Sequence, residues 1–429
     1  MGFFDKLFKK NEKNEEKAAK PKAEPKPAPK AEAPKAAPAQ PKASTGNPGP
    51  YDFIVPPVAS PNDGKIPKDA ILPAADLGPL LPGAPAGGKI KLAVYWCAAC
   101  GGCDVSLLDT HERLLTIGDM ADIVMWPIAE DGKEKDIEAM DDGEITVSII
   151  SGAVRNTENE HMTKLLRQKS KIVVAYGTCA AFGGSPALAN LVPGGAEEIL
   201  DYVYTKTPSS ASFQNEYHKD APQIPQEKTQ VPEGELTIPT LYDTVKTLDQ
   251  VIDVDYTVPG CPPLPESISQ LLKAVADFVY NGVPLPPKGT VVGTTTKTLC
   301  EECPRQKTGA RITELKEPFQ VDIDPNACLM EQGILCLGPA TMGGCGARCT
   351  RVGQPCRGCY GPSPDVQEQG ASIFTAVASL FPILDEDPTC GEDEIIRIMS
   401  SIKDPLGYFY AYTLGKSLIK RAVVEKGGN

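Results

Sequence analysis

Cysteine dominates the chemistry that this chain could perform. The 14 cysteines among 429 residues are too numerous to be incidental and too sparse for a small disulfide scaffold. The three histidines, His111, His161 and His218, are scattered, and none lies within three residues of a cysteine. This spacing argues against a His-rich metal site or a mixed Cys/His zinc finger. Thiolate binding of a metal ion or an iron–sulfur cluster is therefore the leading hypothesis.

Eight of the cysteines lie within 60 residues, in the pattern C-x2-C-x24-C-x7-C followed by C-x3-C-x6-C-x2-C. They are Cys300, Cys303, Cys328, Cys336, Cys345, Cys349, Cys356 and Cys359. Eight ligands are enough for two four-thiolate sites. The surrounding sequence is rich in Gly and Pro and has no helical or strand period, so bound metal would have to hold it together. The paired cysteines alone do not separate zinc ribbons from iron–sulfur clusters.

Apolar, strand-like runs alternate with helical patterns before this segment. Strands are expected at residues 89–96, 122–128, 144–150, 171–176 and 251–258, and helices at 104–117, 159–170 and 267–280. Continuous Val/Ile runs between helices are typical of a buried parallel sheet. We therefore predict an α/β domain over residues 89–290, with a flavodoxin-like, doubly wound parallel sheet. An irregular domain with some helix, stabilised by its metal or cluster sites, should follow over residues 291–429.

Four more cysteines directly follow three of these strands: Cys100, Cys103, Cys179 and Cys261. In a parallel open sheet such loops lie at the carboxyl edge, where these folds bind ligands, so the four thiolates should converge. Neighbouring glycines would let the backbone approach a bulky cofactor. Structural zinc usually takes its ligands as local pairs, whereas Cys179 and Cys261 are isolated on separate loops, so the spacing favours a cluster over zinc.

Three remaining side chains are expected to have structural roles. Cys97, at the end of the first strand, is expected to be a packed thiol rather than a competing ligand, because free cysteine is readily buried. Cys390 lies in an acidic loop and is expected at the surface. His111 is in register with the leucines of the first predicted helix and is expected inside the protein.

The first 88 residues differ from the rest in composition. Residues 1–50 carry 11 Lys against 6 acidic residues and form a Lys/Ala/Pro-rich tail that is predicted to be disordered. Its amphipathic start, residues 1–10, could dock weakly on a membrane surface or a partner, or stay unfolded. Residues 51–88 look like an extended arm. The remainder is acidic, which argues against nucleic acid as a partner. No transmembrane run or export signal is visible, so a cytoplasmic location is expected.

The cysteine motifs resemble those of the small, electron-transferring subunit of nickel–iron hydrogenases, over about residues 89–361. In that family a proximal 4Fe–4S cluster is held by a C-x-G-C turn, a G-x-C loop and a P-G-C-P-P loop. The matching segments here are Cys100-Gly101-Gly102-Cys103, Gly177-Thr178-Cys179 and Pro259-Gly260-Cys261-Pro262-Pro263. The wider sequence is most similar to the F420-non-reducing, heterodisulfide-reductase-linked type.

The resemblance implies three all-cysteine 4Fe–4S clusters. The implied ligands are Cys100, Cys103, Cys179 and Cys261 for the proximal cluster, Cys345, Cys349, Cys356 and Cys359 for the medial one, and Cys300, Cys303, Cys328 and Cys336 for the distal one. The family's distal motif usually begins with His-x-x-Cys-Pro-Arg, and Cys300 stands in the place of that histidine. Cys349 supplies a fourth medial thiolate that many relatives lack.

The same resemblance implies the function. H2 would be split in a separate nickel–iron hydrogenase large subunit, so no catalytic residue is expected in this chain. Electrons would pass through the three clusters to an iron–sulfur or flavin partner, such as a heterodisulfide reductase complex. One alternative is the cluster subunit of an NADH-quinone-oxidoreductase-like complex, whose first turn carries adjacent cysteines. Another is a zinc-stapled interaction protein.

Overall fold

The computed structural model describes residues 71–72, 88–111, 113–210, 224–382 and 392–419. The predicted tail, its amphipathic start, most of the predicted arm, His218 and Cys390 lie outside these ranges. None of the helices in the described ranges is long and apolar enough to cross a membrane.

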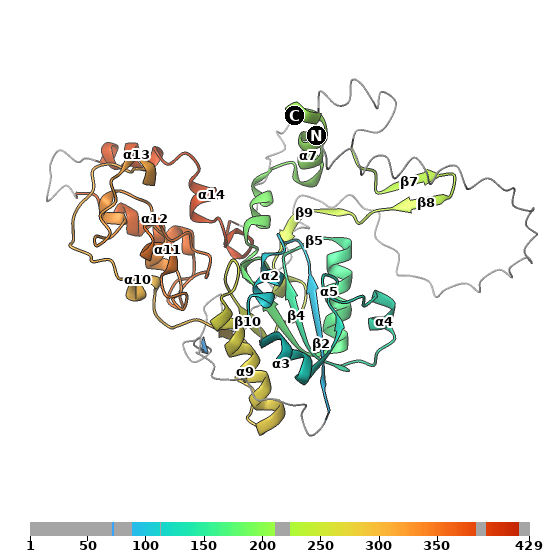
Figure 1. Cartoon of the computed structure of the whole chain (residues 1–429). Coiled ribbons are helices and arrows are strands. Elements are labelled where there is room, and N and C mark those ends of the chain that lie inside the picture. Colours follow the sequence, from blue (N-terminus) through green and yellow to red (C-terminus); the bar gives the residue numbers. More distant parts are fainter. Residues whose placement is uncertain (1–70, 73–87, 112, 211–223, 383–391, 420–429) are drawn as a thin grey trace, which may run out of the picture. The chain divides into compact units, whose positions relative to one another are not determined.

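A parallel sheet of seven strands forms the centre of the first domain, in the order β1-β11-β10-β6-β4-β2-β3. Strands β2, β4 and β10 of this sheet are labelled in Figure 1. The strands are β1 Ile71–Leu72, β2 Ile90–Trp96, β3 Ala121–Met125, β4 Ile145–Ser151, β6 Ser170–Tyr176, β10 Tyr256–Val258 and β11 Thr290–Val292. From β3 to β10 this is the 2-1-3-4-5 order of flavodoxin-like sheets. The predicted α/β, doubly wound architecture is therefore confirmed.

Helices cover both faces of this sheet. The first face packs against α2 Gly102–Leu108, α3 Arg113–Met120 and α9 Pro265–Asn281, and the second against α4 Glu134–Glu138 and α5 Thr157–Lys169. Strand β2 shows how the sequence achieves this. Leu92 and Val94 join the core under α9, whereas Ala93 and Tyr95 join the core under α5, because successive side chains point to opposite faces of a strand.

The predicted helix 104–117 is in fact two helices, and the prediction for His111 was wrong. The hydroxyl of Thr110 donates to the carbonyl of Leu107 (2.6 Å), which ends α2. His111 then takes a left-handed conformation with φ of 54°, and its side chain is exposed. The leucine period continues through the break, so periodicity alone could not reveal it.

Two other elements differ from the predicted strands. The strand expected over 251–258 is reduced to β10, because residues 251–255 form a turn and bends that follow the 3-10 helix η4 Leu248–Gln250. Strand β11 was not predicted, since three residues are too few to show an alternation. It pairs in parallel with both β10 and β1, so two residues of the predicted arm form an edge strand.

Short elements fill the segment between β6 and β10. They are α6 Thr178–Phe182, η2 Ser185–Leu191, α7 Gly195–Asp201, η3 Tyr202–Lys206, β7 Lys228–Val231, β8 Gly234–Thr237 and β9 Leu241–Lys246. Strands β7 and β8 form a hairpin, and β9 pairs with β5 Val154–Asn156.

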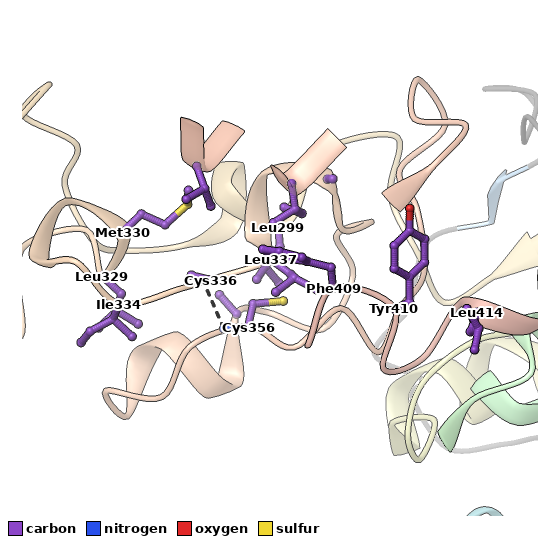
Figure 2. Packing of buried hydrophobic residues seen from close by; sticks show 14 of the residues in the cluster. Leu299, Leu329, Met330, Ile334, Cys336, Leu337, Cys356, Phe409, Tyr410 and Leu414 are labelled. Atoms are coloured by element: carbon purple, nitrogen blue, oxygen red, sulfur yellow. Dashed lines mark hydrogen bonds between the residues drawn. The ribbon is translucent and has the colours of Figure 1, made fainter. Parts of the chain in front are cut away.

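The C-terminal region consists of short helices joined by turns. They are α10 Leu299–Glu302, η5 Pro318–Gln320, η6 Met330–Gln332, η7 Gly338–Ala340, α11 Arg348–Arg351, α12 Gln369–Ala378, α13 Glu392–Ser400, α14 Pro405–Phe409 and η8 Leu414–Lys416. Its core packs Leu337 near Phe409 and contains the thiols of Cys336 and Cys356 (Figure 2). Ile373 and Ile398 are buried in the same core, so the apolar stripes of α12 and α13 pack at least partly within the chain.

Candidate cluster-binding sites

The strands that precede the proximal cysteines end in register. Trp96 of β2 is opposite Ser151 of β4, Ser151 is opposite Tyr176 of β6, and Tyr176 is opposite Val258 of β10. The loops after these residues therefore leave the sheet at one edge, which is the carboxyl edge of a parallel sheet. Cys100 and Cys261 lie on these loops, and Cys103 and Cys179 lie in the first turns of the helices that follow them, α2 and α6.

Electrostatic coupling shows that the four proximal thiols lie close together. The pKa of the Cys179 thiol is raised to about 12, first by burial and then by Cys261 and Cys100. The pKa of Cys103 is also raised, by burial and then by Cys179 and Cys261. Four thiolates in such proximity repel one another unless a positively charged centre joins them, so this donor set suits a metal centre.

Two glycines keep the space beside these sulfurs open. A Cβ atom on Gly177 would lie 2.3 Å from Sγ of Cys103, and one on Gly184 would lie 2.5 Å from Sγ of Cys179. Both glycines also have positive φ angles, of 82° and 55°, which other residues rarely adopt. The backbone amide of Gly102 donates to Sγ of Cys100 at 3.4 Å. Open space, a backbone amide donor and four thiols from three separate segments fit a 4Fe–4S cluster.

Thr178 joins the proximal loops to the C-terminal region. Its backbone amide donates to the carbonyl of Gly260 (2.9 Å), and its hydroxyl accepts from the Gly260 amide (3.1 Å). The same hydroxyl donates to the carbonyl of Cys359. One threonine thus fixes the Cys179 loop against both the Cys261 loop and the Cys359 loop.

A cavity in the C-terminal region is lined by all four predicted distal cysteines: Cys300, Cys303, Cys328 and Cys336. The buried guanidinium of Arg305 holds the surrounding segments together. It donates to the carbonyls of Thr350 (2.7 Å), Asp324 (2.7 Å) and Ala327 (3.0 Å). The four thiols come from three segments of the chain, and this arginine links two of them, those of Cys303 and Cys328. Four converging thiols again fit a cluster.

The predicted medial cysteines also lie together. The pKa of the Cys359 thiol is raised to about 12 by burial and then by Cys345, with smaller contributions from Cys261 and Cys349. The pKa of Cys345 is raised as well, by burial and then by Glu302 and Cys349. Among the four, Cys349 is exposed.

Two medial cysteines touch the neighbouring groups. The amide of Cys356 donates to Sγ of Cys336 at 3.2 Å (Figure 2), so Cys356 lies against the distal group as well as near Cys359. Cys359 in turn accepts a hydrogen bond from the backbone of Cys261, a proximal cysteine. The three groups therefore form one contiguous series, with the medial group between the other two.

Comparison with known proteins identifies the family. Residues 100–275 match the family model described as NADH ubiquinone oxidoreductase, 20 Kd subunit. The chain is 39% identical over 342 residues to the iron–sulfur subunit of the F420-non-reducing hydrogenase of Archaeoglobus profundus, covering 78% of this chain and 99% of the relative. The chain belongs to the family of F420-non-reducing hydrogenase iron–sulfur subunits. As the sequence resemblance indicated, it is a small subunit of a hydrogenase, which is an oxidoreductase.

Two further proteins are similar to this hydrogenase small subunit. The corresponding F420-non-reducing hydrogenase subunit of Methanothermobacter marburgensis is 34% identical over 342 residues, covering 79% of this chain and 99% of the relative. Among solved structures, an NAD+-reducing NiFe hydrogenase in the H2-reduced state is 29% identical, covering 46% of this chain and 97% of that chain with a TM-score of 0.36.

Cys97 of this hydrogenase small subunit is a core residue, as predicted. Its side chain is 3% exposed and packs with Ala93, Tyr95 and Met125 under the second face of the sheet. Burial, followed by the nearby Glu158, raises the pKa of this thiol to about 12. His161 is exposed and pairs with Glu134, with 2.6 Å between Nε2 and Oε1.

Sequence reasoning missed the residues that join the sites. Thr178 lies inside the G-T-C motif, and Arg305 lies inside the C-P-R motif, but neither motif shows which loops they contact. Their partners are distant in sequence, since Thr178 and Cys359 are 181 residues apart. Only tertiary structure reveals such links.

Proposed function

We propose that this small subunit carries electrons from H2 oxidation in a separate nickel–iron large subunit to an iron–sulfur or flavin partner, such as a heterodisulfide reductase complex, through three 4Fe–4S clusters. The proposed location is the cytoplasm, where thiols stay reduced. The proposed ligands are Cys100, Cys103, Cys179 and Cys261 (proximal), Cys345, Cys349, Cys356 and Cys359 (medial), and Cys300, Cys303, Cys328 and Cys336 (distal). Each bound cluster would take up and release single electrons.

The contiguity of the three thiol groups is the observation that carries this proposal. A chain that merely used zinc to staple its loops would need no contact between sites. Here Cys359 lies against Cys261, and Cys356 lies against Cys336. Cys336 and Cys356, where the distal and medial groups meet, are both buried. Exclusion of water at this junction favours electron exchange between the two neighbouring centres.

The surface at the proximal edge supports docking of a large subunit. Cys100 and Cys261 are exposed there. Beside them, Trp96 at the end of β2 and Val105 and Leu108 of α2 expose large apolar side chains, which are 44%, 55% and 43% exposed. Exposed apolar side chains around a site of this kind mark a protein interface.

Metal content and electron paramagnetic resonance of the anaerobically purified complex test the proposal. Three 4Fe–4S clusters correspond to about twelve iron atoms per chain. Cys179→Ser or Cys261→Ser should remove one cluster signal, whereas Cys97→Ser, a matched change in the same domain, should leave all three. Three intact signals in the Cys179→Ser and Cys261→Ser proteins would contradict the ligand assignment. Zinc in place of iron would favour the stapled interaction protein.

A further inference from the structure

We propose that Lys307 raises the reduction potential of the distal site and so makes this site the preferred electron acceptor within the chain. This inference rests on the proposed function, because it requires a 4Fe–4S cluster on the four distal thiols. Reduction adds one electron, and therefore one negative charge, to a centre that four thiolates already make anionic. A nearby ammonium group stabilises the reduced state more than the oxidised state.

Lys307 lies at the distal thiols themselves. It lines the cavity that contains Cys300, Cys303, Cys328 and Cys336, together with one other cation, Arg305. The guanidinium of Arg305 donates to three backbone carbonyls, and Arg305 is not among the groups that shift the pKa of Cys300. Lys307 instead directs its ammonium group to Sγ of Cys300. There it forms a hydrogen bond to the thiol. Burial raises the pKa of Cys300, and the positive charge of Lys307 opposes this rise more than any other group does.

Both sequence neighbours of Lys307 are anchored. The amide of Gln306 donates to the carbonyl of Asn326 (2.7 Å), and the amide of Cys328 donates to the carbonyl of Gln306 (2.8 Å). On the other side, the amides of Thr308 (2.8 Å) and Gly309 (2.9 Å) donate to the carboxylate of Glu331. The backbone of Lys307 is thus fixed between a ligand loop and a capped turn, so only its flexible side chain needs ordering.

The positive charge of Lys307 acts on the distal thiols despite the carboxylate that lies nearby. Glu331 is the facing carboxylate, and Lys307 helps to lower its pKa. Glu331 is nevertheless not among the groups that shift the pKa of Cys300, whereas Lys307 is. The proximal site differs, because the charged groups that shift the pKa values of Cys103 and Cys179 are other thiols and Asp104. The cation lies at the end of the thiol series that is remote from the sheet edge, which favours electron movement in that direction.

Redox titration of the purified complex, followed by electron paramagnetic resonance, tests this inference. Cys328→Ser first identifies the distal signal. At a fixed solution potential, Lys307→Met should raise the oxidised-to-reduced ratio of that signal about tenfold, which is about 59 mV for a one-electron couple. Lys307→Arg, which keeps the charge, should restore most of the wild-type ratio. Lys273→Met, which removes one lysine charge on α9, should leave the ratio unchanged.

The outcomes separate this inference from the proposed function. An unchanged distal potential in Lys307→Met and in Lys307→Gln would overturn the role of Lys307, with the cluster assignment intact. Loss of the distal cluster in both variants, but not in Lys307→Arg, would show that the lysine anchors the loop, and would equally overturn it. If Cys328→Ser removes no signal from the complex, the cluster assignment itself fails, and this inference fails with it.

Discussion

The sheet edge and the C-terminal region hold their cysteines by opposite means. The proximal thiols follow β2, β6 and β10, whose last residues are in register because the strands are hydrogen-bonded over their length. The eight C-terminal thiols lie among turns and helices of three or four residues. Cys336 and Cys356 are themselves part of the core there. In the first region the fold positions the ligands, whereas in the second the ligands contribute to the fold.

Removal of iron should unfold the cysteine-rich part of the C-terminal region and leave the sheet folded. In the iron-free protein, the amides of residues 299–361 should lose their protection against hydrogen exchange, because the free energy of cluster binding is folding energy for so irregular a segment. Strands β2, β4 and β6 should stay protected, because their core contains no iron ligand except Cys103. Hydrogen exchange read by mass spectrometry measures both regions in one sample. Equal loss in the two regions would contradict the comparison.

Gly177→Ala should remove the proximal cluster and spare the others. The new methyl group would lie 2.3 Å from Sγ of Cys103, in a backbone conformation with φ of 82° that disfavours alanine. Iron content should fall by about one third. Gly118→Ala in α3 is the matched control, since nothing lies within 4 Å of the added Cβ. Full iron content in Gly177→Ala would mean that this turn is not part of a cluster site.

The same division explains what could be predicted from sequence. The convergence of Cys100, Cys179 and Cys261 followed from three strand-like runs, because parallel strands leave the sheet at only one edge. The end of α2 at Leu108 was not visible, since the leucine period continues beyond it. In the C-terminal region, spacing grouped Cys356 with Cys359, but it could not show that the amide of Cys356 also contacts Cys336. The helices that carry Cys300 and Cys349, α10 and α11, are only four residues long, which is too short to convert sequence spacing into position.

Asp255→Asn should weaken the sheet region by about 2–3 kcal/mol at neutral pH. Burial pushes the pKa of Asp255 upward, but hydrogen bonds from Lys288, Arg167 and the Val173 amide outweigh it and hold the pKa below its usual range. Because the folded pKa is the lower one, this stabilisation is complete above about pH 4. It is lost as the pH falls through the folded value, so the two proteins should converge in acid.

Urea unfolding of the iron-free protein, followed by tryptophan fluorescence, measures this difference, because both tryptophans, Trp96 and Trp126, lie in the sheet region. Asp277→Asn is the control, since the Asp277 side chain interacts with Lys273 and Asn281 of its own helix, and loss of the ion pair should cost less than about 0.5 kcal/mol. Identical stability of Asp255→Asn and wild type at pH 7 would show that this contact does not stabilise the sheet.

The smallest effect should come from the buried thiol that is not a ligand. Cys97→Ala removes one sulfur from a packed core and should cost about 1 kcal/mol, with all iron retained. Cys356 is similarly buried, at 6% exposure, but Cys356→Ala should remove the medial cluster from the C-terminal region. The two substitutions delete the same atom from comparable surroundings, so burial cannot explain a difference between them. Iron analysis and hydrogen exchange of the pair would show whether a thiol there binds iron or merely fills space.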